Sequence, residues 1–425
     1  MKTTACKIQP ERDIRLIPFS PACERDRLEI RCQVYGEEDG ETELTFAIDS
    51  TIIGRQTLPL KKDEYTLAQC YWDLKGLSGV HTVFVNGKGV PLVVQKEKQP
   101  VLDGGFVTFG PPNDRRQCDA YRDTLKIFTD DDWRRYVDEM AKIGQDAIIA
   151  MVAYQFTEHL KIEETPEGKA VNPTLKAHFP SALYPKSDIA AEDPIAAVLQ
   201  AAEKNGQQVF IGIGNMYGYW GKEEEIGELF QRYDRYSSFY GWYFAFEMNM
   251  SDFHREYWET QCRLSDFARS LSPVKPILIS PYSIPGEAFI ESVLSKPDAF
   301  DILMPQDTVG QKRMDLEGSR TMSESLLRFC KMVDKHFWAN CESFNFENGY
   351  RIVPRFMDGG MDGEAGFIQQ IETVRPYAEK IMTFMLSGLF NPPGFFPCPG
   401  GEKTINQYCT YAEYFNTRAA KGGQP

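Results

Sequence analysis

The strongest constraint on the fold is an alternation that runs from about residue 103 to residue 392. Short apolar stretches typical of buried strands alternate there with amphipathic stretches typical of helices, and the pattern repeats eight times. Such alternation means parallel strands joined by crossover helices. Eight units in roughly 300 residues predict an α/β fold, a (β/α)8 TIM barrel with some long loops. The predicted strands lie in GGFVTFG, DAIIAMVAYQF, QQVFIGIGN, FYGWYFAFEMN, KPILISPYSI, AFDILMPQD, FWANCESFN and IMTFMLSGLF.

An open, doubly wound parallel sheet is the alternative fold for this pattern. Such a sheet would normally carry a Gly-rich phosphate-binding turn after its first strand. The corresponding stretch here, FGPPND, is a poor match to that turn. The barrel is therefore the preferred prediction.

The first 98 residues have a different rhythm. Runs such as DRLEIRCQVYG and GVHTVFVNGKGVPLVV cluster β-branched and aromatic residues, with turn signals between them and no helical pattern. They predict a small all-β sandwich of immunoglobulin-like type. We expect residues 1–98 to form this accessory domain, KEKQP to serve as a linker, and residues 103–420 to form the barrel domain.

Composition narrows the partners. The chain has 425 residues and a net charge of −14, and no run is rich in Lys or Arg. These features argue against nucleic acid and anionic membrane surfaces as partners. No apolar run reaches membrane-spanning length, so we expect no membrane insertion. The start, MKTTACKIQPERD, shows no signal peptide, which predicts a cytoplasmic protein, or a secreted or periplasmic one whose leader has been removed. Nothing in the pattern predicts the oligomeric state.

In a TIM barrel the functional side chains lie at the carboxyl ends of the strands. Those ends are rich in polar and aromatic residues here, and we predict that they bind the substrate. In strand order, the candidates are Tyr154, Gln155, Asn215, Tyr217, Trp220, Asn249, Tyr282, Gln306, Asp307 and Asn340.

Two carboxylates stand out at the ends of the fourth and seventh strands. Side chains alternate between the two faces of a strand, so Glu247 shares a face with small Ala245 and should point into the narrow barrel. Glu342 shares its face with Asn340, which predicts an inward-facing, hydrogen-bonded pair. Two carboxyls across a barrel mouth are the equipment of glycoside hydrolysis. A separation of about 5–5.5 Å gives retention of configuration, and a wider one gives inversion.

This arrangement resembles that of the large clan of retaining (β/α)8 glycoside hydrolases. The barrel is also similar to the hydrolase-like family catalogued as domain of unknown function 4434, through GWYFAFEMN, DILMPQDTVG and FWANCESFN. The resemblance implies that Glu247 is the acid/base and Glu342 the nucleophile. The clan usually has Asn directly before the acid/base, where this chain has Phe246. Either Asn249 takes that role or the sugar 2-hydroxyl is bound differently.

Structural roles compete with several of these functional ones. A single Glu at a strand end is more often salt-bridged or solvated than catalytic; two at strands four and seven favour catalysis. Asp307 is either a helix cap or turn residue, or a third carboxylate in the site. Tyr217 and Trp220 either stack on sugar rings or cap the barrel. Their loop contains Gly218 and Gly221, which favours the sugar platform.

Metal chemistry has no support in the sequence. The five histidines form neither H-x-H nor H-E-x-x-H, and no phosphate-binding or G-x-S-x-G motif is present. We expect no catalytic metal and no organic cofactor.

Three functions remain open at this point. The leading hypothesis is a glycoside hydrolase that cleaves an oligo- or polysaccharide by a retaining two-carboxylate mechanism. The alternative is a non-catalytic glycan-binding protein on the same scaffold, in which the glutamates only bind sugar hydroxyls. A barrel lyase or isomerase is the third, but it usually needs a metal or a lysine at a strand end, and neither is convincingly placed.

Overall fold

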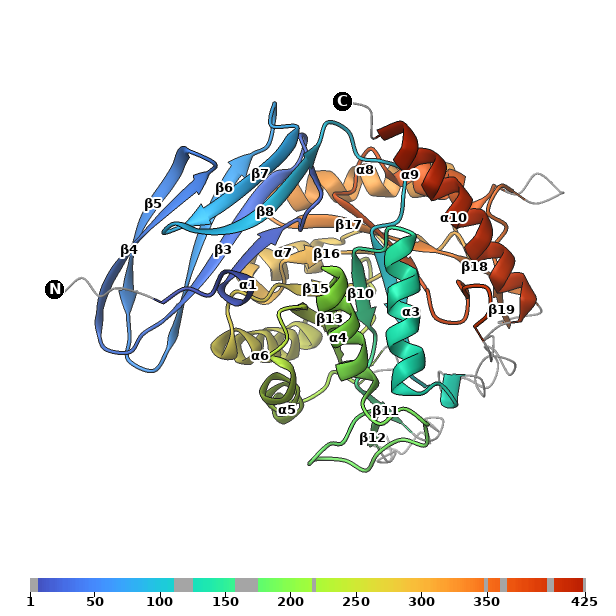
Figure 1. Ribbon diagram of the computed structural model, residues 1–425, viewed down its shortest axis with the longest axis horizontal. Helices are drawn as coiled ribbons and strands as arrows, with labels where there is room; N and C mark the ends of the chain where they lie inside the picture. The colour runs from blue at the N-terminus through green and yellow to red at the C-terminus, as the bar shows by residue number, and fades with distance from the viewer. Residues whose placement is uncertain are drawn as a thin grey trace.

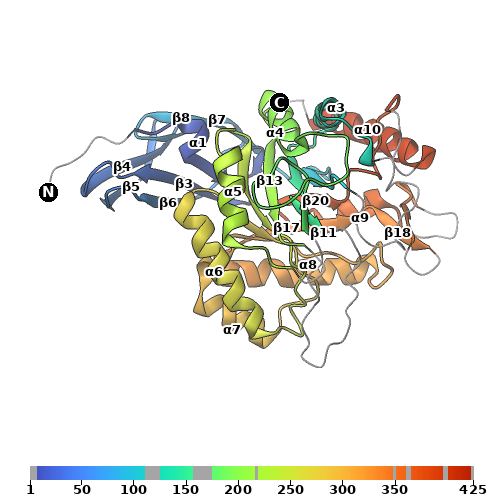
Figure 2. The same ribbon diagram turned by 90° about the horizontal axis from the view of Figure 1, so that it is seen from below.

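The computed structural model describes residues 7–110, 125–156, 175–215, 219–347, 351–359, 365–395 and 401–422. Two parts are visible in Figures 1 and 2. The strands β1 to β8 lie on one side of a barrel, and the C-terminal helix α10 packs on another side of it.

The prediction of a TIM barrel is confirmed. Eight parallel strands close into one barrel, and each overlaps a stretch predicted to be a strand, with β17 and β20 beginning one residue earlier than predicted. In chain order they are β9 (Gly104–Val107), β10 (Ala147–Ala150), β13 (Gln208–Ile213), β14 (Phe239–Phe244), β15 (Ile277–Ile279), β16 (Ile302–Leu303), β17 (His336–Glu342) and β20 (Lys380–Phe384).

Helices follow these strands, and local sequence signals set their ends. Thr129 begins the first of them with a capping box, in which its side chain accepts from the N–H of Asp132 at 3.2 Å. Gly206 ends the next in the left-handed conformation, with φ of 74°. The helices are α3 (Asp130–Lys142), α4 (Pro194–Asn205), α5 (Glu223–Tyr233), α6 (Arg255–Leu271), α7 (Glu287–Ser295), α8 (Leu316–Met332), α9 (Phe367–Val374) and α10 (Glu402–Gly422).

Two hairpins extend the barrel. Strand β11 (Tyr154–Phe156) pairs with β12 (Leu175–Ala177), and β18 (Phe344–Glu347) pairs with β19 (Arg351–Pro354). The stretches DAIIAMVAYQF and FWANCESFN were each predicted as one strand, but each overlaps both a barrel strand and a hairpin strand.

The N-terminal region forms the predicted β-sandwich, preceded by the short helix α1 (Pro10–Asp13). The predicted Asn86–Gly87 turn joins β7 to β8, and both residues have positive φ, as a tight hairpin requires. One sheet has the order β1 (Ile14–Ile17), β3 (Arg27–Tyr35), β6 (Tyr65–Asp73), and the other β2 (Ala22–Cys23), β8 (Lys88–Gln95), β7 (Gly79–Val85), β4 (Gly40–Ile48), β5 (Thr51–Leu60).

Strand β3 explains how the sandwich attaches to the barrel. Leu28, Ile30, Cys32 and Val34 point into the sandwich core, while the alternate residues are charged or polar and are also buried. Arg31 donates to Asp301 at 2.5 Å, directly before β16, and Glu29 lies 3.0 Å from His336 at the start of β17.

The sandwich therefore covers the amino-terminal ends of barrel strands, opposite the ends that carry Glu247 and Glu342. The segment after β8 is also packed: Lys98 is buried and its ammonium binds the Asp103 carboxylate at 2.5 and 2.6 Å. Our division into domains at 1–98 and 103–420 stays a proposal.

The barrel interior is filled with aromatic rings. Phe19 packs edge-on against Tyr240 and Trp338 near the sandwich, with ring centroids 5.8 and 5.5 Å apart. Nearer the carboxyl ends, Phe106 packs against Tyr243 at 5.2 Å. The polar residues Asp307 and Glu342 lie at the carboxyl ends, and a second set of buried charges, including Asp103 and Lys380, lies at the amino-terminal ends. Among the described residues, no helix has the length and apolarity needed to cross a membrane.

Candidate functional site

The two predicted carboxylates both lie at the carboxyl ends of barrel strands. Glu342 is the last residue of β17 and only 2% of it is exposed. Glu247 follows the end of β14 by three residues and is partly exposed. The charge of Glu247 raises the pKa of Tyr243, which faces the barrel interior. Glu247 therefore lies on the inner side, as strand alternation predicted.

The carboxylate of Glu342 is held by one residue of the loop between β16 and α8. The backbone N–H of Gln311 donates to Oε2 at 2.9 Å, and its side-chain amide donates to Oε1 at 2.7 Å. Both carboxylate oxygens thus receive a donor, which fixes the orientation of the group and favours its ionised form.

Gly310 lets this loop approach Glu342. A Cβ at this position would lie 2.2 Å from the carbonyl oxygen of Phe344 and 3.0 Å from Oε2 of Glu342. No side chain fits there without moving the backbone. The glycine is needed for close approach and not for an unusual backbone angle.

Asp307 is a third carboxylate, directly beneath Glu342. It is 2% exposed and accepts the backbone N–H of Glu342 at 3.2 Å, that of Val309 at 3.3 Å, and the side-chain amide of Gln370. Burial raises its pKa to about 6, although these hydrogen bonds and the charge of Arg355 act to lower it. Its contacts are those of a positioning group below the site.

Burial also raises the pKa of both predicted catalytic carboxyls. The pKa of Glu247 rises to about 7, with a hydrogen bond to Gln306 acting to lower it. The pKa of Glu342 rises to about 8 through burial and the charge of Asp307, with a further increase from Glu247, while Gln311 acts to lower it. The neighbour with the largest effect on the pKa of Glu342 is thus Asp307, and the charge of Glu247 makes a smaller contribution.

Tyr282, at the end of the fifth barrel strand, belongs to the surroundings of Glu247. Burial raises the pKa of its hydroxyl, and the charge of Glu247 raises it further, while that of Arg313 lowers it. Gln306 contributes its hydrogen bond to the same carboxyl. Two predicted substrate-binding residues thus surround Glu247.

Asn340 does not hold Glu342, and the predicted pairing of the two is wrong. Its amide donates to the hydroxyl of Ser280 at 3.1 Å, and only 2% of the residue is exposed. Gln311, which the sequence patterns did not single out, takes the role instead. Asn249 is partly exposed beside Tyr282, and its carbonyl accepts from the backbone and hydroxyl of Ser251.

Trp220 is close to the acid/base candidate. Its ring stacks on Phe246, the residue before Glu247, with centroids 3.9 Å apart and planes 14° apart. One face of the indole is therefore covered, and the ring is partly exposed. Tyr217 lies outside the described residues. Asn215 is buried and its carbonyl accepts the backbone N–H of Tyr219 at 3.3 Å, which closes the turn.

Tyr154 is not brought to the Glu342 cluster. Its hydroxyl donates to Glu228 of helix α5 at 2.8 Å, and its ring packs against Phe179 and Tyr184. These contacts give it a structural role between the β11 hairpin and α5. Gln155, the next residue on β11, lies near Gly110, where an added Cβ would be 2.7 Å from its side-chain oxygen.

The sequence patterns missed three residues that support the carboxylates: Gln311, Gln370 and Arg355. Gln311 and Arg355 lie on loops or hairpins, and Gln370 lies on α9, so strand ends gave no signal for them. The Gly310–Gln311 pair in the loop between β16 and α8 was the available hint. Among the described residues, no three His, Cys, Asp or Glu side chains are grouped to hold a metal ion. The expected absence of a metal and a cofactor stays a prediction.

Comparison with known proteins adds the family and the fold. Residues 102–396 match the profile of a family described as "Domain of unknown function (DUF4434)". No curated protein matches the chain. Among solved structures, a "putative alpha-L-fucosidase" from Bacteroides thetaiotaomicron aligns over 75% of this chain and 95% of its own, with 17% identity and a TM-score of 0.52. A Bacteroides uniformis β-glucuronidase aligns over 88% of this chain and 45% of its own, with 14% identity and a TM-score of 0.40.

Proposed function

The chain belongs to the DUF4434 family, whose description names no activity, and from the arrangement of its barrel mouth we propose that it is a glycoside hydrolase. The observation that carries the proposal is the position of two carboxyls, Glu247 and Glu342, at the carboxyl ends of strands four and seven of a TIM barrel. Burial raises the pKa of both, and the charge of Glu247 adds to that of Glu342. Hydrolysis of a glycosidic bond needs one carboxyl protonated and one ionised.

The hydrogen bonds support a division of roles within the pair. Glu342 receives two N–H donors from Gln311, which favour its ionised form. Burial raises the pKa of both carboxyls, and the pKa of Glu342 is the higher of the two, so these values do not by themselves divide the roles. We assign Glu342 as the nucleophile because Gln311 fixes both of its carboxylate oxygens, and Glu247 as the acid/base from its position after strand four.

The proposed reaction has two steps. Glu247 protonates the glycosidic oxygen while Glu342 attacks the anomeric carbon, so the leaving sugar departs and a glycosyl-enzyme ester forms. A water molecule then attacks the same carbon while Glu247 takes a proton from that water. The ester bond breaks and Glu342 is released as a carboxylate. Gln306 and Tyr282 lie beside Glu247 and would contact the sugar and the acid/base. The reaction would proceed with retention of configuration.

The test is release of nitrophenol from a panel of aryl glycosides by wild type, Glu247→Gln and Glu342→Gln. Each variant should lose several orders of magnitude in turnover with the fold intact, while Glu317→Gln, an exposed control on α8, should keep wild-type activity. Activated leaving groups should partly rescue the first step in Glu247→Gln, because they need little protonation. Azide should rescue Glu342→Gly and give a glycosyl azide of inverted configuration.

Two outcomes would contradict the proposal. Near-normal activity in Glu342→Gln would show that this residue is not the nucleophile. Binding of oligosaccharides without turnover of any glycoside would favour the alternative, a non-catalytic glycan-binding protein.

A further inference from the structure

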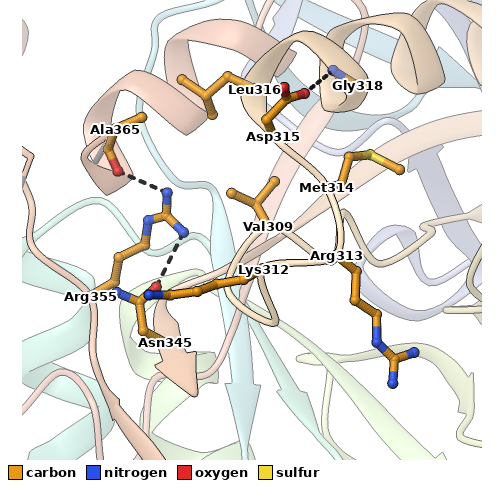
Figure 3. A pocket seen from close by; sticks show the side chains of 10 residues that line it. All are labelled: Val309, Lys312, Arg313, Met314, Asp315, Leu316, Gly318, Asn345, Arg355 and Ala365. Carbon is orange, nitrogen blue, oxygen red and sulfur yellow. Dashed lines mark hydrogen bonds between the residues drawn. The ribbon is translucent and has the colours of Figure 1, made fainter. Parts of the chain in front are cut away.

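A hollow of about 610 Å³ lies beside the loop that holds Glu342. Figure 3 shows its lining from the β16–α8 loop, the start of α8, the β18–β19 hairpin and the segment before α9. Its lining residues are Val309, Lys312, Arg313, Met314, Asp315, Leu316, Gly318, Asn345, Arg355 and Ala365.

Two connections place this hollow next to the proposed nucleophile. Lys312 directly follows Gln311, whose backbone and side chain both bind Glu342. On the other wall, Asn345 is three residues beyond Glu342 along an extended chain, about 10 Å at the rise of a strand. Both walls of the hollow are therefore continuous in the chain with the nucleophile candidate or with the residue that holds it.

The lining is cationic in a strongly acidic protein. Lys312, Arg313 and Arg355 line it, whereas the whole chain carries a net charge of −14. Among the described lining residues the acid is Asp315, whose carboxylate accepts the backbone N–H of Gly318 at 2.8 Å and caps helix α8. Lys312 and Arg355 have interactions of their own, so the positive charge that favours an anionic ligand is chiefly that of the exposed Arg313.

The cations differ in how they are held. Arg355 is 7% exposed, and its guanidinium donates to the carbonyl of Ala365 at 2.8 Å and to Asn345 at 3.4 Å, so its orientation is fixed (Figure 3). Arg313 is exposed and forms no ion pair with any residue that the structure describes. Figure 3 shows its guanidinium directed away from Arg355, and its charge acts on Tyr282 next to Glu247. The loop thus presents positive charge from the hollow to the barrel mouth.

We propose that this hollow is a subsite for the anionic substituent of an acidic glycan, with a sugar carboxylate as its ligand. The inference rests on the proposed function and names the substrate class for the same site. Arg and Lys supply charged donors for carboxylate oxygens. Val309, Met314 and Leu316 supply an apolar wall for the C–H face of the ring. A sulfate ester carries a negative charge as a carboxylate does, and the experiment below distinguishes the two ligands.

The experiment measures binding by calorimetry to the full-length Glu342→Gln protein, which should not turn over the ligand. The probes are oligosaccharides of galacturonic, glucuronic and mannuronic acid, each beside its carboxyl methyl ester, which keeps the size and removes the charge. Sulfated galactan oligosaccharides form the second arm. At least one uronate should bind tenfold or more tightly than its ester, and the preference should shrink as salt is added.

Variants that remove one positive charge then identify the residues responsible for the preference for the acid over its ester. Arg313→Gln and Lys312→Gln, each added to Glu342→Gln, should each weaken uronate binding about tenfold and leave ester binding unchanged. Arg328→Ala removes the same charge from an exposed position on α8 and should change neither. Three outcomes would each overturn the carboxylate subsite. They are equal affinity of every acid and its ester, an unchanged preference for the acid over the ester in both variants, and tighter binding of the sulfated probes than of the uronates.

Failure of this inference is distinguishable from failure of the proposed function. Binding is read on a protein with its nucleophile removed, so it does not depend on hydrolysis. A wild-type protein that cleaves neutral glycosides and shows no acid preference would keep the proposed function and overturn the subsite. Acid-selective binding without hydrolysis of any glycoside would keep the subsite and overturn the proposed function.

Discussion

Gln311 binds both oxygens of the Glu342 carboxylate, through its backbone N–H at 2.9 Å and its side-chain amide at 2.7 Å. The two residues are 31 positions apart, on a loop after the sixth barrel strand and at the end of the seventh. The carboxylate of Glu342 is therefore oriented by the loop that follows the neighbouring sixth strand, and not by Asn340 on the seventh strand itself.

Removal of this side chain should impair the proposed nucleophile. Gln311→Ala takes away one donor to a carboxylate, a bond of about 1.5–3 kcal/mol, so kcat/KM should fall about 10- to 100-fold. The pKa of Glu342 should rise further above about 8, which moves the limb of the pH–rate profile near pH 8 to higher pH. Steady-state kinetics across pH checks both effects. Gln200→Ala, an exposed glutamine on α4, is the control; a Gln311→Ala protein with unchanged kinetics would remove Gln311 from the site.

The activity should have its maximum near neutral pH. Burial raises the pKa of Glu247 to about 7, and burial with the charge of Asp307, and a smaller addition from Glu247, raises that of Glu342 to about 8. The form with one proton on the pair is the active one, so kcat/KM should fall below about pH 7 as the second proton binds and above about pH 8 as the last one leaves.

A pH–rate profile with an uncharged aryl glycoside measures this window. Glu247→Gln, assayed with an activated leaving group, should lose the alkaline limb, because that limb reports loss of the acid's proton. Ordinary carboxyls would place the maximum near pH 4–5. A maximum there would mean that burial does not raise these pKa values in the working protein.

The attachment of the sandwich to the barrel should weaken as pH rises. Burial opposes protonation of His336, but Glu379 at 2.9 Å and Glu29 at 3.0 Å raise its pKa to about 10. The folded pKa is above that of an unfolded His, about 6.5. The stabilisation is therefore complete below about pH 6.5 and is lost as pH rises through about 10.

Chemical denaturation of wild type and His336→Gln between pH 6 and 10 tests this sign. The wild type should be more stable by a few kcal/mol at pH 6, and the difference should shrink toward pH 10. Comparing the two proteins cancels the titration of groups common to both. His254→Gln, an exposed position, should show no such trend. A difference that is constant or grows with pH would show that His336 is not held protonated by these carboxylates.

Much of the site was predictable because it depends on strand ends. The carboxyl ends of parallel strands meet at one edge of the barrel, so the positions of Glu247 and Glu342 follow from the strand pattern and alternation alone. Gln306 and Tyr282 are also found beside Glu247, as their strand positions indicated. Tyr154 shows the limit of the rule, because a hairpin follows β10 and turns its hydroxyl toward α5.

The sequence by itself determined the barrel, the sandwich and the two carboxylates, because hydrophobic periodicity and strand ends are local properties of the chain. Only the tertiary structure decided which groups orient and charge those carboxylates. Asp307 and Gln311 reach Glu342 from the segment between β16 and α8, and Gln370 reaches Asp307 from α9. The charged face of β3 shows the same limit. Glu29 alternates like a solvent-exposed residue, yet it is buried against His336, 307 residues away, because the sandwich packs on the barrel. Contacts between segments that distant depend on how the elements pack, and no local pattern encodes them.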